Sequence, residues 1–189
     1  MQRTTLALAF LAASAAANAS DFDYNYVSVG YGNMSLDEVD VDGDGFGVGA
    51  SFALTDSYHV FAGYEIADLD YDVEASTMSV GLGWNHSLSP VLDLVTQLSY
   101  QYVELDAPGF NSVDDSGLGL GLGLRFAATE KLELDGGIGY VDLGDGGDET
   151  SLGAGGLYSF TKAFAMGLGG SWSDDASSYT VSGRFYFGK

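Results

Sequence analysis

Large apolar residues alternate with glycine, serine or polar residues along almost the whole chain from Tyr24 onward. In the segment 116–126, leucines and Phe126 occupy every second position, and glycines and Arg125 occupy the positions between them. Successive side chains of a β-strand point to opposite faces, so this period of two predicts strands with one apolar face and one small or polar face. The pattern predicts ten strands, at residues 23–33, 45–54, 58–67, 76–86, 92–103, 116–126, 131–141, 150–160, 163–173 and 178–187. Glycine blurs the alternation in 131–141 and 150–160, so eight strands is the alternative count.

The chemistry of the two faces bears on the class of fold. In a soluble barrel or sandwich the apolar face points inward, whereas in a membrane barrel it points outward to lipid. The predicted strands are close to the roughly nine to eleven residues with which a tilted strand crosses a bilayer. Glycine fills much of the second face, aromatic residues gather near strand ends, and short turns alternate with longer connections. These features favour an all-β, transmembrane antiparallel up-and-down barrel, with a soluble barrel or sandwich as the alternative.

The first segment differs from the rest of the chain. Arg3 precedes an apolar stretch at 6–17, and Ala17, Asn18 and Ala19 fit the small-x-small pattern of a cleavage site. A membrane-spanning helix requires about 20 apolar residues, which is more than this stretch holds. The sequence therefore predicts a cleaved secretory signal peptide at 1–19 and one barrel domain at 20–189.

Composition excludes several classes of protein. The chain has 27 Asp and Glu against 6 Lys and Arg, for a formal net charge of −21, so little in it can neutralise nucleic-acid phosphates. We therefore expect no nucleic-acid partner. The absence of cysteine excludes disulfides, cysteine zinc sites and thiol chemistry.

The charges are divided between the two ends of the predicted barrel. The longer connections, at 34–44, 68–75, 104–115, 142–149 and 174–177, hold 19 of the 27 carboxylates and neither Lys nor Arg. The basic residues after Arg3 all lie toward the short turns, and they are Arg125, Lys131, Lys162, Arg184 and Lys189. Because short turns face the periplasm in membrane barrels of this class, we expect the longer acidic loops to be extracellular and to attract cations.

Together with this arrangement, the last strand, SSYTVSGRFYF, resembles that of the small outer-membrane β-barrel proteins, the OmpA transmembrane-domain/OmpX-like members of the porin-like superfamily. The resemblance implies a location in the cell outer membrane of a Gram-negative envelope, in contact with outer-membrane lipid and lipopolysaccharide. It also implies the barrel assembly machinery and periplasmic chaperones as partners. Barrels of this family usually end in an aromatic residue that the machinery reads. Here Gly188 and Lys189 follow, so we expect a displaced assembly signal at Tyr179, Val181, Phe185 and Phe187.

Six charged residues fall on the small, inward face of the predicted strands: Glu65, Asp93, Arg125, Glu133, Asp135 and Arg184. A buried charge is costly without a partner, so we expect these residues to pair. The cluster would be either a salt-bridge plug that holds the barrel shut or a gate or selectivity ring. Since the rest of this face is mostly Gly and Ser, side chains cannot fill a ten-strand interior, and we predict a hydrated lumen that narrows at the cluster.

One loop contains a partial metal-binding motif. Asp40, Asp42, Asp44 and Gly45 match the opening D-x-D-x-D-G of an EF-hand loop. The twelfth position would be Ser51 instead of a bidentate glutamate, and no helices are predicted beside it. Diffuse binding of Ca²⁺ or Mg²⁺ by clustered carboxylates is therefore favoured over a structured site, and we predict no cofactor.

The two histidines bear on enzyme function. The resemblance implies that outer-membrane proteases place an Asp–His pair at the extracellular rim, whereas His59 and His86 fall at the short-turn end, as turn-capping or interfacial residues. We therefore predict that the protein is not an enzyme. The leading hypothesis is a structural or surface-interaction role, toward an extracellular ligand or host surface that the sequence does not identify. A narrow porin-like channel for cations or small solutes is the alternative, and a loop-based enzyme is third.

Overall fold

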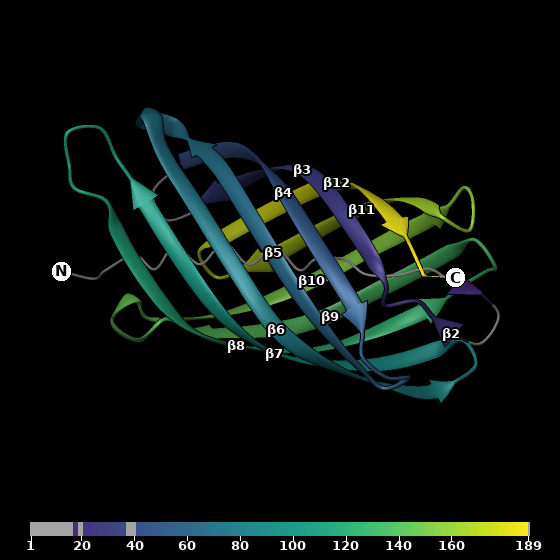
Figure 1. The fold of residues 1–189 in the computed structure, drawn as a ribbon. Helices are drawn as coiled ribbons and strands as arrows, with labels where there is room; N and C mark the ends of the chain where they lie inside the picture. Colours follow the sequence, from purple (N-terminus) through teal and green to yellow (C-terminus); the bar gives the residue numbers. More distant parts are fainter. Residues whose placement is uncertain (1–16, 19–20, 37–40, 189) are drawn as a thin grey trace.

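Ten strands form one closed antiparallel barrel in the computed structural model, which describes residues 17–18, 21–36 and 41–188 (Figure 1). Each strand pairs with its neighbours in the chain, and β12 closes the ring by pairing with β3. The strands are β3 (Tyr26–Leu36), β4 (Val41–Ala53), β5 (Tyr58–Leu69), β6 (Val73–Ser89), β7 (Leu92–Asp106), β8 (Val113–Ala127), β9 (Leu132–Asp142), β10 (Asp148–Ser159), β11 (Phe164–Ser173) and β12 (Ala176–Tyr186). The predicted all-β up-and-down barrel of ten strands is confirmed, and the eight-strand alternative is wrong.

Four small elements complete the described structure. β1 (Ala17–Asn18) and β2 (Asp21–Phe22) pair with each other outside the barrel sheet, and they flank the predicted cleavage point. Cleavage there stays a prediction. η1 (Asp70–Asp72) and η2 (Gly144–Gly146) are single 3-10 turns between strands. Across the described residues, we find no helix with the length and apolar character needed to span a membrane.

One end of the barrel carries the short turns 54–57, 90–91, 128–131 and 160–163, and we call it the turn end. Three of these turns have threonine at the second position: Thr55, Thr129 and Thr161. Each threonine hydroxyl accepts hydrogen bonds from the backbone amides two and three residues later, at 2.9–3.2 Å. This local bonding supplies the backbone with the partners it needs for a tight reversal. The C-terminus lies at the same end (Figure 1).

At the opposite end, which we call the acidic end, the connections are shorter than the sequence predicted. β6 begins at Val73 instead of 76, β7 runs to Asp106, and β8 begins at Val113. The connections that remain there are 70–72, 107–112, 143–147 and 174–175, while 37–40 lies outside the described residues. Most carboxylates expected in loops therefore lie on strands. The reason is that strand pairing uses backbone groups and continues beyond the apolar region whatever the side chains are.

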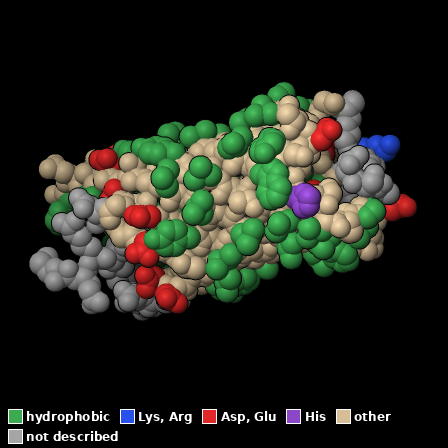
Figure 2. Space-filling model, turned by 90° about the horizontal axis from the view of Figure 1, so that it is seen from below, with side chains coloured by type: hydrophobic (Ala, Val, Ile, Leu, Met, Phe, Trp, Pro, Cys, Tyr) green, Lys and Arg blue, Asp and Glu red, His purple; other side chains and the backbone are tan. Residues whose placement is uncertain are grey.

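The two faces of the sheet are arranged as expected for a membrane barrel in its middle part. Apolar side chains such as Phe46 and Leu168 point outward and are 65% and 67% exposed, and such side chains cover the middle of the surface (Figure 2). Toward the acidic end the pattern inverts. Inward-pointing Met34, Leu36 and Leu69 belong to a buried apolar cluster, while the outward positions of neighbouring strands hold carboxylates. This inversion marks the level at which the wall passes from an apolar to an aqueous environment.

Candidate functional site

The lumen contains a cavity of about 230 Å³ in its middle part. Its wall is formed largely by glycine backbone, and its side chains are mainly hydroxyls and amides from Ser28, Thr77, Ser79, Gln97, Ser99, Gln101, Ser171, Thr180 and Ser182. A water molecule requires only about 15 Å³ measured in this way, so the cavity has room for many. The glycine-rich inward face therefore leaves an unfilled space in the lumen, and its hydration stays a prediction.

Arg125 occupies the turn end of this cavity and lies close to the end of β8. Its Nε donates to Glu133 Oε1 on β9 at 2.9 Å, and both residues are 2% exposed. In the strand register Arg125 lies directly opposite Asp93 and Asp135, yet its ion pair is with Glu133, which is two residues along β9 from Asp135. The structure therefore brings four of the predicted lumen residues together at the turn end: Asp93, Arg125, Glu133 and Asp135.

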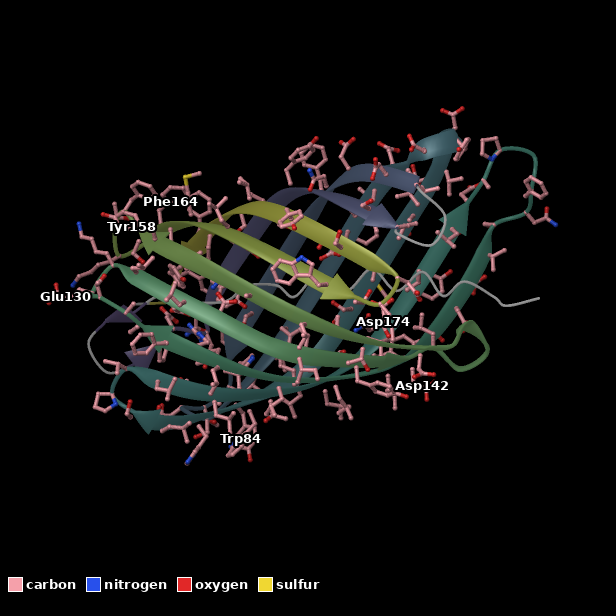
Figure 3. The ribbon with its side chains drawn as sticks, turned by 180° about the vertical axis from the view of Figure 1, so that it is seen from behind. Trp84, Glu130, Asp142, Tyr158, Phe164 and Asp174 are labelled. Atoms are coloured by element: carbon pink, nitrogen blue, oxygen red, sulfur yellow. The ribbon has the colours of Figure 1, made fainter. Side chains whose placement is uncertain are left out.

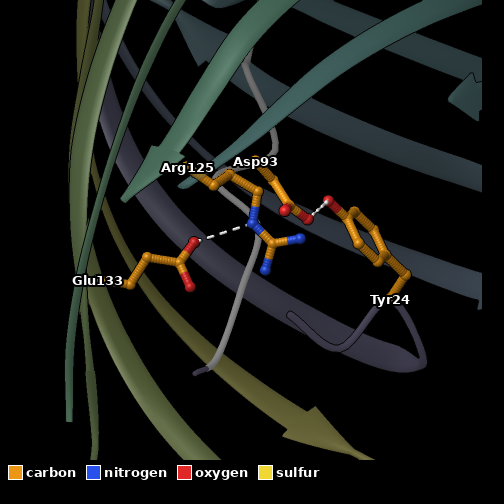
Figure 4. Close-up of polar contacts among 4 residues, drawn as sticks. All are labelled: Tyr24, Asp93, Arg125 and Glu133. Carbon is orange, nitrogen blue, oxygen red and sulfur yellow. Dashed lines mark hydrogen bonds and ion pairs between the residues drawn. The ribbon is translucent and has the colours of Figure 1, made fainter. Parts of the chain in front are cut away.

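Two aromatic rings from the N-terminal segment lie against the same guanidinium. The Arg125 Cζ atom is 4.5 Å from the ring centroid of Phe22 and 4.4 Å from that of Tyr24. The Tyr24 hydroxyl donates to Asp93 Oδ2 at 3.1 Å (Figure 4). Burial raises the pKa of the Tyr24 phenol well above its ordinary value, so this hydroxyl remains a donor. Asp93 also accepts a hydrogen bond from the Ser87 hydroxyl, at 2.7 Å.

Arg184 on β12 belongs to the same buried cluster, because it interacts electrostatically with Glu133 and Asp135. It is 1% exposed, and its Cζ atom lies 4.0 Å from the ring centroid of Tyr26. Tyr26 in turn makes an edge contact with Tyr186, with ring centroids 6.1 Å apart. Among the described residues, Arg184 makes no ion pair within 4.0 Å. The prediction that every lumen charge has an ion-pair partner is therefore wrong for Arg184.

Glu65 lies apart from this cluster, on the wall of the cavity. It sits in the middle of β5, in register with Gly47 and Thr77. Its Oε2, like Asp135 Oδ1, is buried without a hydrogen-bond partner among the described residues. The expectation that Glu65 meets an arginine is not met, because its strand position places it farther along the barrel than Arg125.

Carboxylates form a continuous row on the outside of the acidic end. Asp44 of β4 is the register partner of Asp68 of β5, Asp68 is the partner of Glu74 of β6, and Glu74 is the partner of Asp106 of β7. We call these four residues the acidic row, and all of them are exposed. Asp142 and Asp174 also lie at this end, whereas Glu130, Tyr158 and Phe164 lie at the turn end (Figure 3).

The EF-hand-like motif does not take up a calcium-loop conformation in the part that is described. Asp40 lies outside the described residues. Asp42 and Asp44 lie on the outward face of β4, the Asp42 amide donates to Asp70 Oδ2 at 3.2 Å, and Asp44 Oδ2 accepts from the Tyr31 hydroxyl at 3.0 Å. Within the described ranges, we find no three His, Cys, Asp or Glu side chains placed to hold one metal ion.

The two histidines lie in different environments at the turn end. His59 points into the lumen and is 2% exposed, with its Nδ1 3.3 Å from Asn85 Oδ1 and its ring stacked on Tyr24 at 4.5 Å. His86 stacks on Trp84 at the outer surface, with centroids 5.4 Å apart. His86 is exposed on the outer surface, and its interfacial role stays a prediction, whereas His59 points into the lumen beside Tyr24.

The predicted assembly residues share one face of the last strand. Tyr179, Val181 and Phe185 point outward from β12, and Phe187 follows the strand and is also exposed. Phe185 contacts Phe164, with ring centroids 4.9 Å apart. Phe185 and Phe187 present an aromatic outer surface at the turn end, whereas Tyr179 lies toward the acidic end of β12. The assembly role stays a prediction.

Sequence reasoning missed Phe22, Tyr24 and His59 as lumen residues. The sequence pattern includes Tyr24 in the first predicted strand, but that strand begins at Tyr26. A signal was nevertheless present, because Tyr24 and Tyr26 alternate onto the small face, opposite to Val27 and Val29. Two bulky aromatic residues on a face otherwise rich in glycine indicate a filled part of the lumen.

Comparison with known proteins bears on the fold. The sequence model of the family described as "Outer membrane protein beta-barrel domain" matches residues 4–169. No curated protein matches the chain. Among solved structures, the KdgM porin is 10% identical with a TM-score of 0.50, over 85% of this chain and 99% of that one.

Two further solved structures are similar at lower TM-scores. The N-terminal β-barrel domain of Pseudomonas aeruginosa OprF is 13% identical, over 85% of this chain and 98% of that one, with a TM-score of 0.46. Neisserial surface protein A is 16% identical, over 87% and 98%, with a TM-score of 0.47. At these identities the likeness concerns the fold alone.

Proposed function

Because the chain belongs to the outer-membrane protein β-barrel domain family and is thus an outer-membrane protein, we propose that it acts at the cell surface as a non-enzymatic barrel whose acidic end attracts cations. The single observation that carries this proposal is the acidic row, Asp44–Asp68–Glu74–Asp106, in which each carboxylate faces the next across neighbouring strands.

Like charges directly opposite each other destabilise a sheet pair, so the row is costly for the isolated protein. The described basic residues are Arg125, Lys131, Lys162 and Arg184, and all of them lie in the lumen cluster or the short turns. With no basic residue of the described chain nearby, the field at this end raises the local concentration of solvent cations. Short turns face the periplasm in such barrels, which supports an extracellular position for the acidic row.

The lumen supports a structural role over a permanently open pore. Two hydrogen-bonded pairs cross its turn end, Arg125 with Glu133 and Tyr24 with Asp93. At its acidic end, Met34 and Leu69 pack inside the lumen. The cavity between them favours a second candidate function, a narrow passage for cations or small polar solutes, if either end can open.

Magnesium-dependent unfolding of the refolded barrel in lipid vesicles tests the cation proposal. We expect Mg²⁺ to raise the unfolding midpoint of the wild-type protein, because bound cations relieve the repulsion along the acidic row. In a variant carrying Asp68→Asn, Glu74→Gln and Asp106→Asn, Mg²⁺ should raise the unfolding midpoint much less. The control is Asp56→Asn with Glu130→Gln, two exposed carboxylates at the turn end, which should respond like the wild type. Equal responses of the wild type and the acidic-row variant would overturn the proposal.

Conductance of refolded protein in planar bilayers at several salt concentrations separates the two candidate functions. A surface barrel should carry no discrete current, whereas a passage should give current steps that favour cations at low salt and lose that preference at high salt. Steady conductance by the wild-type protein would favour the channel.

A further inference from the structure

We propose that residues 22–25 are a removable plug, and that the turn end of the lumen is a docking site for such an extended segment with aromatic side chains at alternate positions. This inference goes beyond the proposed function, because it concerns the inside of the turn end and does not depend on the acidic row.

The segment crosses the lumen from one wall to the other. It leads into β3, yet Tyr24 contacts His59 on β5, Asp93 on β7 and Arg125 on β8. In the ring of ten strands, β7 and β8 are four and five strands away from β3, so they form the opposite wall. A side chain that reaches them spans the interior and cannot simply cover one strand.

The docking site offers a specific contact to each part of the segment. The Arg125 guanidinium lies against the rings of both Phe22 and Tyr24, the two side chains that alternation places on one side of an extended segment. Asn25 fixes the base of the segment, because its Oδ1 accepts from the Ala53 amide at 3.0 Å and its carbonyl accepts from the Phe187 amide at 3.1 Å.

The segment can leave without unfolding the barrel. Residues 23–25 belong to no strand, and the barrel ladder begins at Tyr26. Arg125 keeps its ion pair with Glu133 when the rings are withdrawn, so this buried guanidinium retains its counter-charge. The predicted cleavage after Ala19 would also leave Phe22 as the third residue from a free end.

The position of the segment gives it a consequence for access. Arg125 and Tyr26 line the cavity, whereas Phe22 and Tyr24 lie outside its lining, on the far side of Arg125. The docked segment therefore stands between the hydroxyl-lined cavity and the turn end. Its withdrawal gives small polar solutes access to the cavity from that side.

The test measures how fast a water-soluble maleimide labels a cysteine beneath the segment. His59→Cys places the thiol under the Tyr24 ring, and the chain has no other cysteine. In refolded protein comprising residues 20–189 we expect slow labelling. Addition of Phe22→Ala and Tyr24→Ala, or deletion of residues 20–25, should raise the rate toward that of Thr129→Cys in an exposed turn.

Two comparisons make the result specific. Tyr158→Ala with Phe160→Ala removes the same residue types at the same spacing from the outer surface of the same end, and it should leave the rate unchanged. The peptide Ser-Asp-Phe-Asp-Tyr-Asn, added to the deletion variant, should restore slow labelling, whereas Ser-Asp-Ala-Asp-Ala-Asn should not.

Heat-modifiable migration on cold gels verifies that each variant is folded. If the double alanine variant does not fold, the deletion variant and the peptide decide the question, because the deletion leaves every barrel strand intact. Labelling that is equally slow in the deletion variant, or protection that the aromatic peptide fails to restore, overturns the proposal. Neither result would affect the cation response of the acidic row.

Discussion

The two ends of the barrel place their charges in opposite ways. At the turn end, Arg125, Glu133 and Asp93 point into the lumen, are buried, and make an ion pair or hydrogen bonds. At the acidic end, Asp68 and Glu74 point outward, are exposed, and face other carboxylates. One position along a strand decides between the two outcomes, because alternate residues lie on opposite faces. For these residues, parity in the strand thus decides whether a charge is buried beside a partner or exposed beside other carboxylates.

Loss of a buried charge at the turn end should have the largest effect. Arg125→Ala leaves Glu133 buried without its ion-pair partner, and removing one member of a buried pair typically costs about 3–5 kcal/mol. We expect a loss of that size in the free energy of unfolding, measured by urea titration of the refolded barrel. Lys131→Ala, in an exposed turn of the same end, is the control and should change it by less than about 0.5 kcal/mol. Equal effects of the two substitutions would remove the distinction between inward and outward charges.

A hydrogen bond to a buried carboxylate should matter less than its charge partner. Tyr24→Phe keeps the ring against Arg125 and His59 but removes the donor to Asp93, and a hydrogen bond to a charged group is worth about 1.5–3 kcal/mol. We expect a loss near the lower value, because the Ser87 hydroxyl still donates to Asp93. Tyr158→Phe at the outer surface is the matched control. No difference between these two variants in urea unfolding would show that the Tyr24 hydroxyl contributes nothing.

At the acidic end, removal of a charge should have the opposite sign and the smallest size. Asp148 faces Asp142 on the neighbouring strand, and a like-charged pair directly opposite costs roughly 0.2–1 kcal/mol. Asp148→Asn should therefore stabilise the barrel by about that amount at low ionic strength. The gain should disappear in about 1 M salt, where charges are screened over about 3 Å. Destabilisation by Asp148→Asn at low salt would mean that the carboxylate has a favourable partner.

Alternation alone was enough to predict the fold. Leu118–Leu124 and their intervening glycines define both faces of β8, and similar patterns define the other nine barrel strands. The strands were predicted too short at the acidic end, because outward positions such as Glu74 and Asp114 continue the period of two with polar side chains. The sequence pattern of a strand in water differs there from that of a strand in lipid.

The lumen site was predictable in its charges but not in its contacts. Arg125, Glu133 and Asp93 carry the inward parity in the sequence, so their meeting followed from strand register. The choice of Glu133 over Asp135 as ion-pair partner depends on side-chain geometry. The position of Phe22 and Tyr24 across the lumen depends on a segment outside the barrel strands, whose path no period describes.

Surface labelling of single cysteines on whole cells tests most directly the central claim that the acidic end is at the cell surface and the turn end is in the periplasm. The native chain has no cysteine, so the background is clean. Asp72→Cys and Ser112→Cys at the acidic end should react with a membrane-impermeant thiol reagent, whereas Thr129→Cys and Lys162→Cys at the turn end should not. Reaction of the turn-end cysteines with protection of the acidic-end cysteines would contradict the account.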